Sequence, residues 1–173
     1  MTPAVQMLMT DVSALNVSLQ VATEAPDELP SEEQFGHWVR LAIEGSSTTV
    51  PADACVTVRL VDAEEIARLN ERFRETARPT NVLAFPAAAM LPVDDAEVEL
   101  GDLIICLEVV RREADEQGKT LINHLAHLTL HGSLHLVGYD HMDDAEASAM
   151  EALETRLLAG LGIADPYEYR DAG

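Results

Sequence analysis

The sequence predicts a single layered α/β domain of the α+β kind, in which a small four-stranded mixed sheet packs with about five helices. Three observations support this fold class. The 173 residues suffice for one ordinary domain. The chain is 47% hydrophobic and 24% charged, which is an ordinary globular balance. Short β-rich runs alternate with helical patterns early in the chain, and helical patterns dominate later.

The first predicted elements are a strand and a helix. Val17, Leu19 and Val21 alternate with polar or small residues, which indicates a strand. Ser31 is a suitable N-cap for a helix that begins with two acidic residues, and Gly45 is a suitable stop. Before the first strand, we expect residues 1–14 to form a loose N-terminal extension.

Further strands and helices follow in the same order. Residues 55–61 are β-rich, and Asp62 with Glu65 forms a box-like N-terminal pattern for a helix that ends near Arg74. A third strand is expected at 82–85 between Pro79 and Pro86, and an acidic loop at 87–99. A fourth strand opens at 101–102 and runs to 106. Helices are expected at 108–117, 120–137 and 143–160. The domain would span 15–163, followed by a polar, frayed C-terminal tail at 164–173.

The charge balance excludes one class of function. Eleven basic residues against 31 acidic ones give a net charge of −20, so nonspecific binding of nucleic acid through bulk charge is not expected. Any contact with RNA needs a local basic patch. No run of about 18 apolar residues is present, so we expect no membrane span. Cys55 and Cys106 are too few for a disulfide framework and suit a reducing, cytoplasmic location.

Five of the six histidines lie between positions 124 and 141. His124, His127, His131 and His135 fall within about 80° of one another on a helical wheel, on one face of the predicted helix. His131 and His135 are four residues apart, so their rings can share one metal ion. Because Gly138 can end the helix in a left-handed conformation, the chain can turn back and bring His141 to the same ion. The sequence therefore predicts a metal site on a central helix and the turn after it.

Three histidine ligands leave a tetrahedral ion one open position, which is typical of a catalytic site. Zinc is the first candidate, although imidazole also suits nickel, copper and iron. The spacing matches that of the metzincin peptidases, H-E-x-x-H-x-x-G-x-x-H, but Gly132 stands where those enzymes have their catalytic glutamate. A metallopeptidase is therefore a weaker alternative.

Other readings of the cluster remain open. His127 and His131 have the same four-residue spacing, but they lie a turn further from Gly138. The favoured interpretation of His124 and His127 is hydrogen bonding in the core or behind the ligands. Asp140 could orient an imidazole or accept a proton, or simply be a turn residue.

Three arginines, Arg72, Arg74 and Arg78, lie within seven residues of this acidic chain. A guanidinium group can clamp a phosphate in a planar fork, and at the end of a helix it can also complement the helix dipole. This segment is the strongest candidate in the sequence for a local phosphate-binding patch.

Residues 131–141, HGSLHLVGYDH, resemble the signature of the YbeY family of bacterial endoribonucleases and rRNA maturation factors. Residues 73–74 followed by 79–86 are similar to the family's second motif, and 101–105 resemble the third. The likeness extends from about residue 17 to residue 167.

The resemblance implies a metal-dependent endoribonuclease that is specific for single strands and acts in 16S rRNA 3′-end maturation and ribosome quality control. It implies zinc at His131, His135 and His141, and a functional arginine at Arg74; Asp140 is our candidate for moving a proton. The implied partners are single-stranded RNA, the 16S rRNA precursor, and the ribosome or small-subunit proteins. A metal-stabilised ribosome assembly factor without nuclease activity is the main alternative. The net charge suggests that a ribosome or protein partner delivers the substrate.

Overall fold

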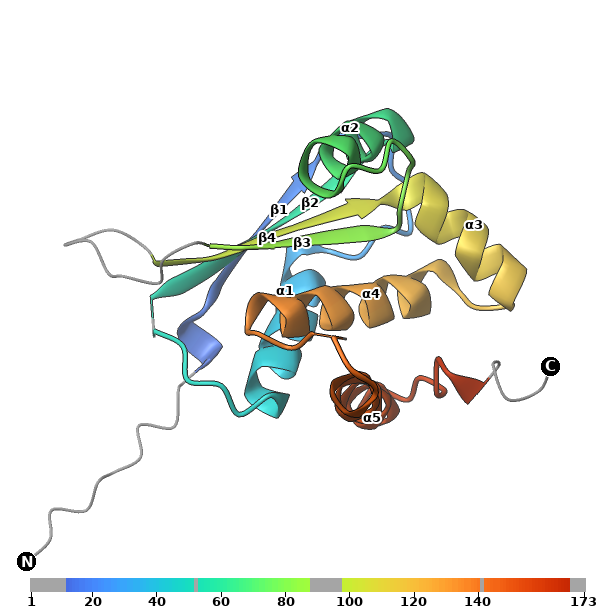
Figure 1. The fold of residues 1–173 in the computed structure, drawn as a ribbon. Helices are drawn as coiled ribbons and strands as arrows, with labels where there is room; N and C mark the ends of the chain where they lie inside the picture. Colours follow the sequence, from blue (N-terminus) through green and yellow to red (C-terminus); the bar gives the residue numbers. More distant parts are fainter. Residues whose placement is uncertain (1–11, 52, 88–97, 141, 169–173) are drawn as a thin grey trace, which may run out of the picture.

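The computed structural model describes residues 12–51, 53–87, 98–140 and 142–168 (Figure 1). A short 3-10 helix (Val12–Ala14) precedes the sheet. The strands are β1 (Asn16–Val21), β2 (Ala54–Val61), β3 (Val82–Pro86) and β4 (Val98–Cys106). The helices are α1 (Glu32–Gly45), α2 (Ala63–Arg74), α3 (Leu107–Gln117), α4 (Leu121–Leu136) and α5 (Asp144–Gly160). The predicted α+β domain with a four-stranded sheet and five helices is confirmed within these residues.

The sheet is mixed, as the sequence predicts, and its strand order is β1-β2-β4-β3. β1 pairs with β2 and β2 with β4 in parallel, whereas β3 pairs with β4 antiparallel. This order leaves β3 as one edge strand. The site described below lies beside that edge.

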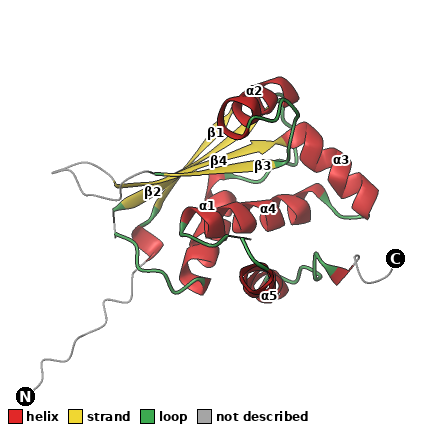
Figure 2. Ribbon diagram, in the orientation of Figure 1, coloured by secondary structure: helices red, strands yellow, loops and turns green. Residues whose placement is uncertain are grey.

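Helices cover both faces of the sheet (Figure 2). α2 lies on one face, while α1 and α4 lie on the other, and α5 packs on the far side of α4 (Figure 1). α4 is therefore enclosed by the sheet, α1, α3 and α5. Its apolar residues are buried in the main core, including Leu125, Leu130 and Leu134, each 0% exposed. A helix held on several sides is a rigid support for functional side chains.

The helix boundaries follow the expected capping residues. Ser31 and Asp62 accept hydrogen bonds from the backbone N–H groups of Gln34 and Glu65. Thr120 and Asp143 do the same at the first turns of α4 and α5. These caps satisfy N–H groups that have no partner within the helix.

β4 begins at Val98, earlier than the Gly101 that the sequence suggests. A register irregularity between β2 and β4 accompanies Gly101, whose φ is +143°. A Cβ atom there would lie 2.2 Å from the carbonyl oxygen of Phe85 on β3. Gly101 therefore permits a close approach of two backbones inside the strand, rather than marking where the strand starts.

No helix of the described residues is long and apolar enough to span a membrane.

Candidate metal centre and cleft

His131 and His135 lie one turn apart on α4, and their rings meet edge-on, with centroids 4.7 Å apart. The two Nε2 atoms are 3.2 Å apart. Two nitrogens that bind one tetrahedral ion at 2.0–2.1 Å are separated by about 3.3 Å, so the observed distance suits a shared zinc ion. The donor set is also suitable, because imidazole is a common zinc ligand.

The chain turns sharply directly after these two histidines. Gly138 has a φ of +103°, a conformation that glycine adopts without steric cost. The backbone N–H of Tyr139 donates to the carbonyl oxygen of Leu134 at 3.1 Å, which closes the end of α4. The predicted role of Gly138 in ending the helix is thus confirmed. His141, the third predicted ligand, lies outside the described residues, so the trio stays a prediction.

The two histidines line a cleft of about 460 Å³. Arg74, at the end of α2, and Asp140, after the turn, line the same cleft. The cleft walls also include Asn81, Val82, Ala84 and Pro86 around β3, and residues of α4 and its turn, namely Gly132, Gly138 and Tyr139. The structure therefore brings the predicted Arg74, Asp140, His131 and His135 to one site. The cationic guanidinium and the two imidazoles share one open space.

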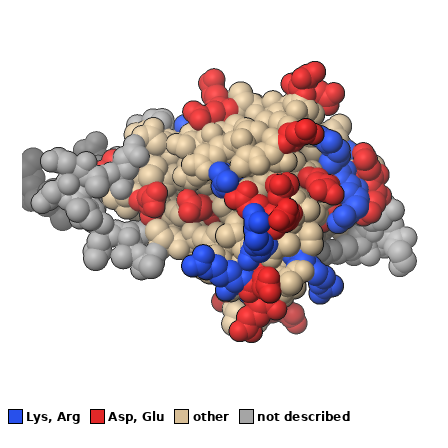
Figure 3. All heavy atoms as spheres, turned by 90° about the horizontal axis from the view of Figure 1, so that it is seen from above, with Lys and Arg blue, Asp and Glu red and all other residues tan. Residues whose placement is uncertain are grey.

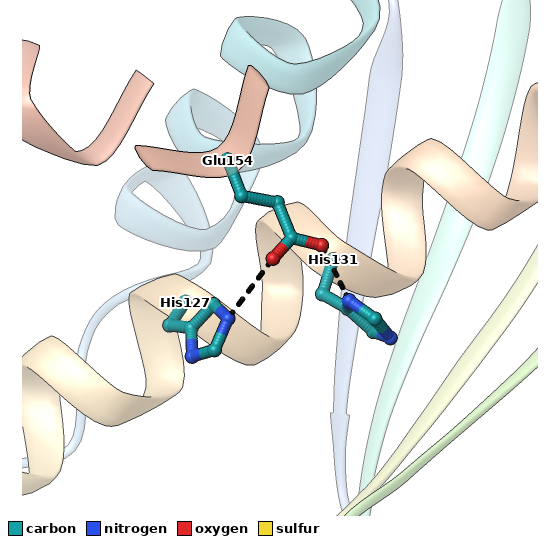
Figure 4. A group of neighbouring side chains, drawn as sticks. All are labelled: His127, His131 and Glu154. Carbon is teal, nitrogen blue, oxygen red and sulfur yellow. Dashed lines mark hydrogen bonds and ion pairs between the residues drawn. The ribbon is translucent and has the colours of Figure 1, made fainter. Parts of the chain in front are cut away.

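Glu154 of α5 is a site residue that the sequence analysis does not identify. Its side chain is 0% exposed, and its carboxylate reaches back to two histidines of α4 (Figure 4). Oε1 lies 2.5 Å from Nδ1 of His131, and Oε2 lies 3.2 Å from Nε2 of His127. The hydroxyl of Tyr167 also donates to Oε2.

Glu154 is charged despite its burial. Burial raises the pKa of this carboxyl, but the hydrogen bonds from His127 and His131 outweigh it, and the pKa falls to about 2. Burial lowers the pKa of His127, with Glu154 opposing the shift. A buried carboxylate is retained only where donors satisfy it.

His127, His131 and Glu154 form a second group able to hold a metal ion, since one candidate ligand atom from each lies within 4.8 Å of the others. This group includes the His127–His131 pair that the sequence leaves open. Both groups use His131, through different ring nitrogens. Nδ1 faces Glu154 and Nε2 faces His135.

His124 does not take part in either group. It is buried, and its Nε2 lies 2.8 Å from Glu113 Oε2 on α3. The expected hydrogen-bonding role of His124 is confirmed. Glu113 also accepts from the side-chain amide of Asn81, just before β3.

One sequence signal does point to Glu154. It occupies a position on the apolar face of α5, four residues after Met150 and four before Leu158, both buried. An acidic residue at such a position requires buried partners. Nothing in the sequence shows that those partners are histidines of another helix.

Residues 20–162 match the family model described as "Endoribonuclease YbeY". The chain is 48% identical over 157 residues to the Endoribonuclease YbeY of Psychromonas ingrahamii, with 88% of this chain and 96% of the relative covered. It is 50% identical to that of Alkalilimnicola ehrlichii, with 91% and 93% covered.

A solved structure resembles the fold. The solution structure of TM1509 from Thermotoga maritima is 26% identical, has a TM-score of 0.54, and covers 90% of this chain and 93% of its own. A family model that spans most of the chain, together with relatives at about half identity, leaves one conclusion. The chain belongs to the YbeY endoribonuclease family.

Proposed function

We propose that this protein is a zinc-dependent endoribonuclease that cleaves single-stranded RNA and acts in 16S rRNA 3′-end maturation and ribosome quality control. The observation that carries the proposal is the shared cleft, which is lined by Arg74 and by the His131–His135 pair. Relatives named Endoribonuclease YbeY support RNA as the substrate.

His131 and His135 would hold the zinc ion through their Nε2 atoms, and His141 would be the third ligand. A bound zinc ion would supply Lewis acidity toward a phosphate oxygen or a water molecule. The chain's own residues then do the remaining work. The exposed Arg74 guanidinium binds the phosphate and neutralises negative charge that develops on its oxygens. Asp140, an exposed residue that lines the cleft, accepts the proton that the attacking group loses.

The substrate would be the 16S rRNA precursor, and its delivery would fall to the ribosome or to small-subunit proteins in the cytoplasm. Charge supports delivery by a partner, because a chain with a net charge of −20 repels RNA at long range. On the face seen in Figure 3, Lys and Arg side chains lie among Asp and Glu side chains. Contact with RNA would therefore be local.

The first experiment separates RNA cleavage by this protein from RNA cleavage by a contaminating nuclease. We expect His131→Ala and His135→Ala to lose bound zinc and to lose cleavage of a single-stranded RNA oligonucleotide. A duplex of the same sequence should be cut poorly by the wild-type protein. Unchanged zinc content and cleavage in both variants would show that the ligand assignment is wrong.

The second experiment tests Arg74. Arg74→Ala should slow cleavage by about 10²–10³-fold, the usual effect of removing one group that stabilises transition-state charge. Arg68→Ala is the matched control, since Arg68 lies on the same helix, pairs with Glu64 at 3.1 Å, and is not part of the cleft. Equal rates for the two variants would remove the phosphate role from Arg74.

A further inference from the structure

Glu154 connects the last helix to the cleft through a buried carboxylate. It is fully buried, and it contacts His127 and His131 of α4 (Figure 4). Tyr167, from the segment after α5, donates a hydrogen bond to the same carboxylate. The backbone N–H of Tyr167 donates a hydrogen bond to Oδ1 of Asp165 at 2.8 Å. Its ring lies edge-on to the ring of His127 at 5.7 Å.

The contact with Glu154 determines which nitrogen of His131 carries the proton. A carboxylate only accepts hydrogen bonds, so Nδ1 of His131, 2.5 Å from Oε1, must be the N–H nitrogen. In the neutral ring the lone pair is then on Nε2. That is the atom that faces Nε2 of His135 at 3.2 Å. The contact therefore fixes both the tautomer and the direction of the ring.

We propose that Glu154 is a positioning residue that holds His131 with its Nε2 lone pair toward the zinc site, and that Tyr167 holds Glu154 in turn. This inference rests on the proposed function, because it takes the ion to lie between His131 and His135. Glu154 and Tyr167, both near the C-terminal end of the described chain, thereby gain a role in the zinc site. In this arrangement neither Glu154 nor Tyr167 is a ligand of the ion.

The competing arrangement places the ion between Glu154, His127 and His131, whose candidate ligand atoms lie within 4.8 Å of one another. His131 would then use Nδ1. We favour the positioning role because the present contacts of Glu154 satisfy both its oxygens, and because Nε2 of His131 is the ring nitrogen that faces His135 in the cleft. The ring nitrogen that binds zinc distinguishes the two arrangements.

The test begins with zinc affinity, measured by competition with a chromogenic chelator. Glu154→Gln keeps the size of the side chain and removes its charge. We expect zinc binding to weaken by about 10–100-fold, the usual effect of losing a carboxylate behind a histidine ligand. Tyr167→Phe should weaken it less. Wild-type affinity in Glu154→Gln would overturn the proposal.

Glu113→Gln is the matched control. Glu113 also pairs with a histidine of α4, at 2.8 Å, but its partner His124 is not a predicted ligand. We expect Glu113→Gln to bind zinc as the wild type does. An equal loss in both glutamine variants would show a general effect of weakened packing around α4 and would also overturn the specific role.

Two measurements on the unaltered protein remain decisive if Glu154→Gln fails to fold. Nitrogen-15 NMR of the zinc-free protein should show His131 as the Nδ1–H tautomer. Zinc-edge anomalous scattering from crystals should place the ion at Nε2 of His131. An ion at Nδ1 beside Glu154 would make Glu154 a ligand and end the proposal. None of these readouts requires RNA cleavage, so absent nuclease activity would overturn only the proposed function.

Discussion

Gly132 shows at the scale of one residue why this cleft lacks the catalytic glutamate of metallopeptidases. A Cβ atom at Gly132 would lie 2.8 Å from Cδ2 of Leu103 on β4 and 3.4 Å from Cγ2 of Val82 on β3. Leu103 is 0% exposed and has little room to move. A glutamate at this position would therefore have to displace the buried Leu103, which argues against the peptidase alternative.

This packing gives a prediction for Gly132→Ala. Alanine favours a helix by up to about 1 kcal/mol over glycine, but overpacking a core costs about 1–3 kcal/mol. We expect a net loss of about 1–2 kcal/mol in the free energy of unfolding, measured with urea. Gly160→Ala is the control, because a Cβ atom there meets nothing within 4 Å, and it should be neutral or stabilising. A Gly132→Ala protein as stable as the wild type would refute the close contact.

The four-residue spacing of His131 and His135 predicts that their rings lie next to each other, because helical geometry is local and periodic. Arg74 is predicted by motif resemblance and Asp140 by its position just before His141, and both line the cleft. Glu154 and Tyr167 could not be found in this way. Their contacts with the histidines of α4 join residues 23 to 40 positions apart, and such pairs depend on how α5 docks on α4.

At the scale of elements, most boundaries follow from local chemistry. The sequence predicts the N-caps Ser31 and Asp62, and the structure has both. It also has N-caps at Thr120 and Asp143, whose side chains suit this position. β4 departs from expectation because Gly101 suggests a loop, although it serves a close contact with β3 inside the strand. The order of the strands depends on packing between distant segments, which periodicity does not reveal.

Glu113 of α3 connects its helix to two other parts of the chain. Its carboxylate pairs with His124 of α4 and accepts a hydrogen bond from Asn81, which directly precedes β3. Partial burial raises the pKa of Glu113, but hydrogen bonds from His124 and Asn81 outweigh it and hold the pKa below 4.5. A carboxyl with a lowered pKa stabilises the fold above pH 4.5, and this contribution is lost as the pH falls through the lowered value.

We therefore expect the wild type to lose stability below about pH 4.5 more steeply than Glu113→Gln does. At neutral pH, Glu113→Gln should be the less stable protein, by about 1–2 kcal/mol for a weakened buried hydrogen bond. Denaturant unfolding at several pH values measures both effects. Parallel pH profiles would show that Glu113 does not link acidity to stability.

At the scale of the whole molecule, the core is built from apolar side chains that do not include the site histidines. Removal of zinc should therefore lower the melting temperature without unfolding the protein. Zinc at 100 times its dissociation constant contributes about 2.7 kcal/mol, which corresponds to about 5–10 °C for a chain of this size. Calorimetry with and without a chelator measures the shift. Loss of the whole transition on chelation would instead indicate a structural metal.

The acidity of the molecule predicts an unusual response to salt. Proteins that bind nucleic acid through 6–10 phosphate contacts show steep losses of affinity as salt rises. Among the described residues that line the cleft, Arg74 is the one Lys or Arg side chain, and the face seen in Figure 3 carries charges of both signs. We expect the slope of log affinity against log salt to be shallow, about −1, for a short single-stranded RNA. A slope near −6 would instead show that the RNA contacts an extended basic surface.

The tie between Glu154, Tyr167 and His131 also has a consequence for biosynthesis. The histidines leave the ribosome before the two residues that support them. A nascent chain interrupted after α4 would carry the catalytic helix without its anchoring carboxylate. We therefore expect the zinc site to form fully only after translation has passed Tyr167. Products that terminate earlier should cleave ribosomal RNA poorly.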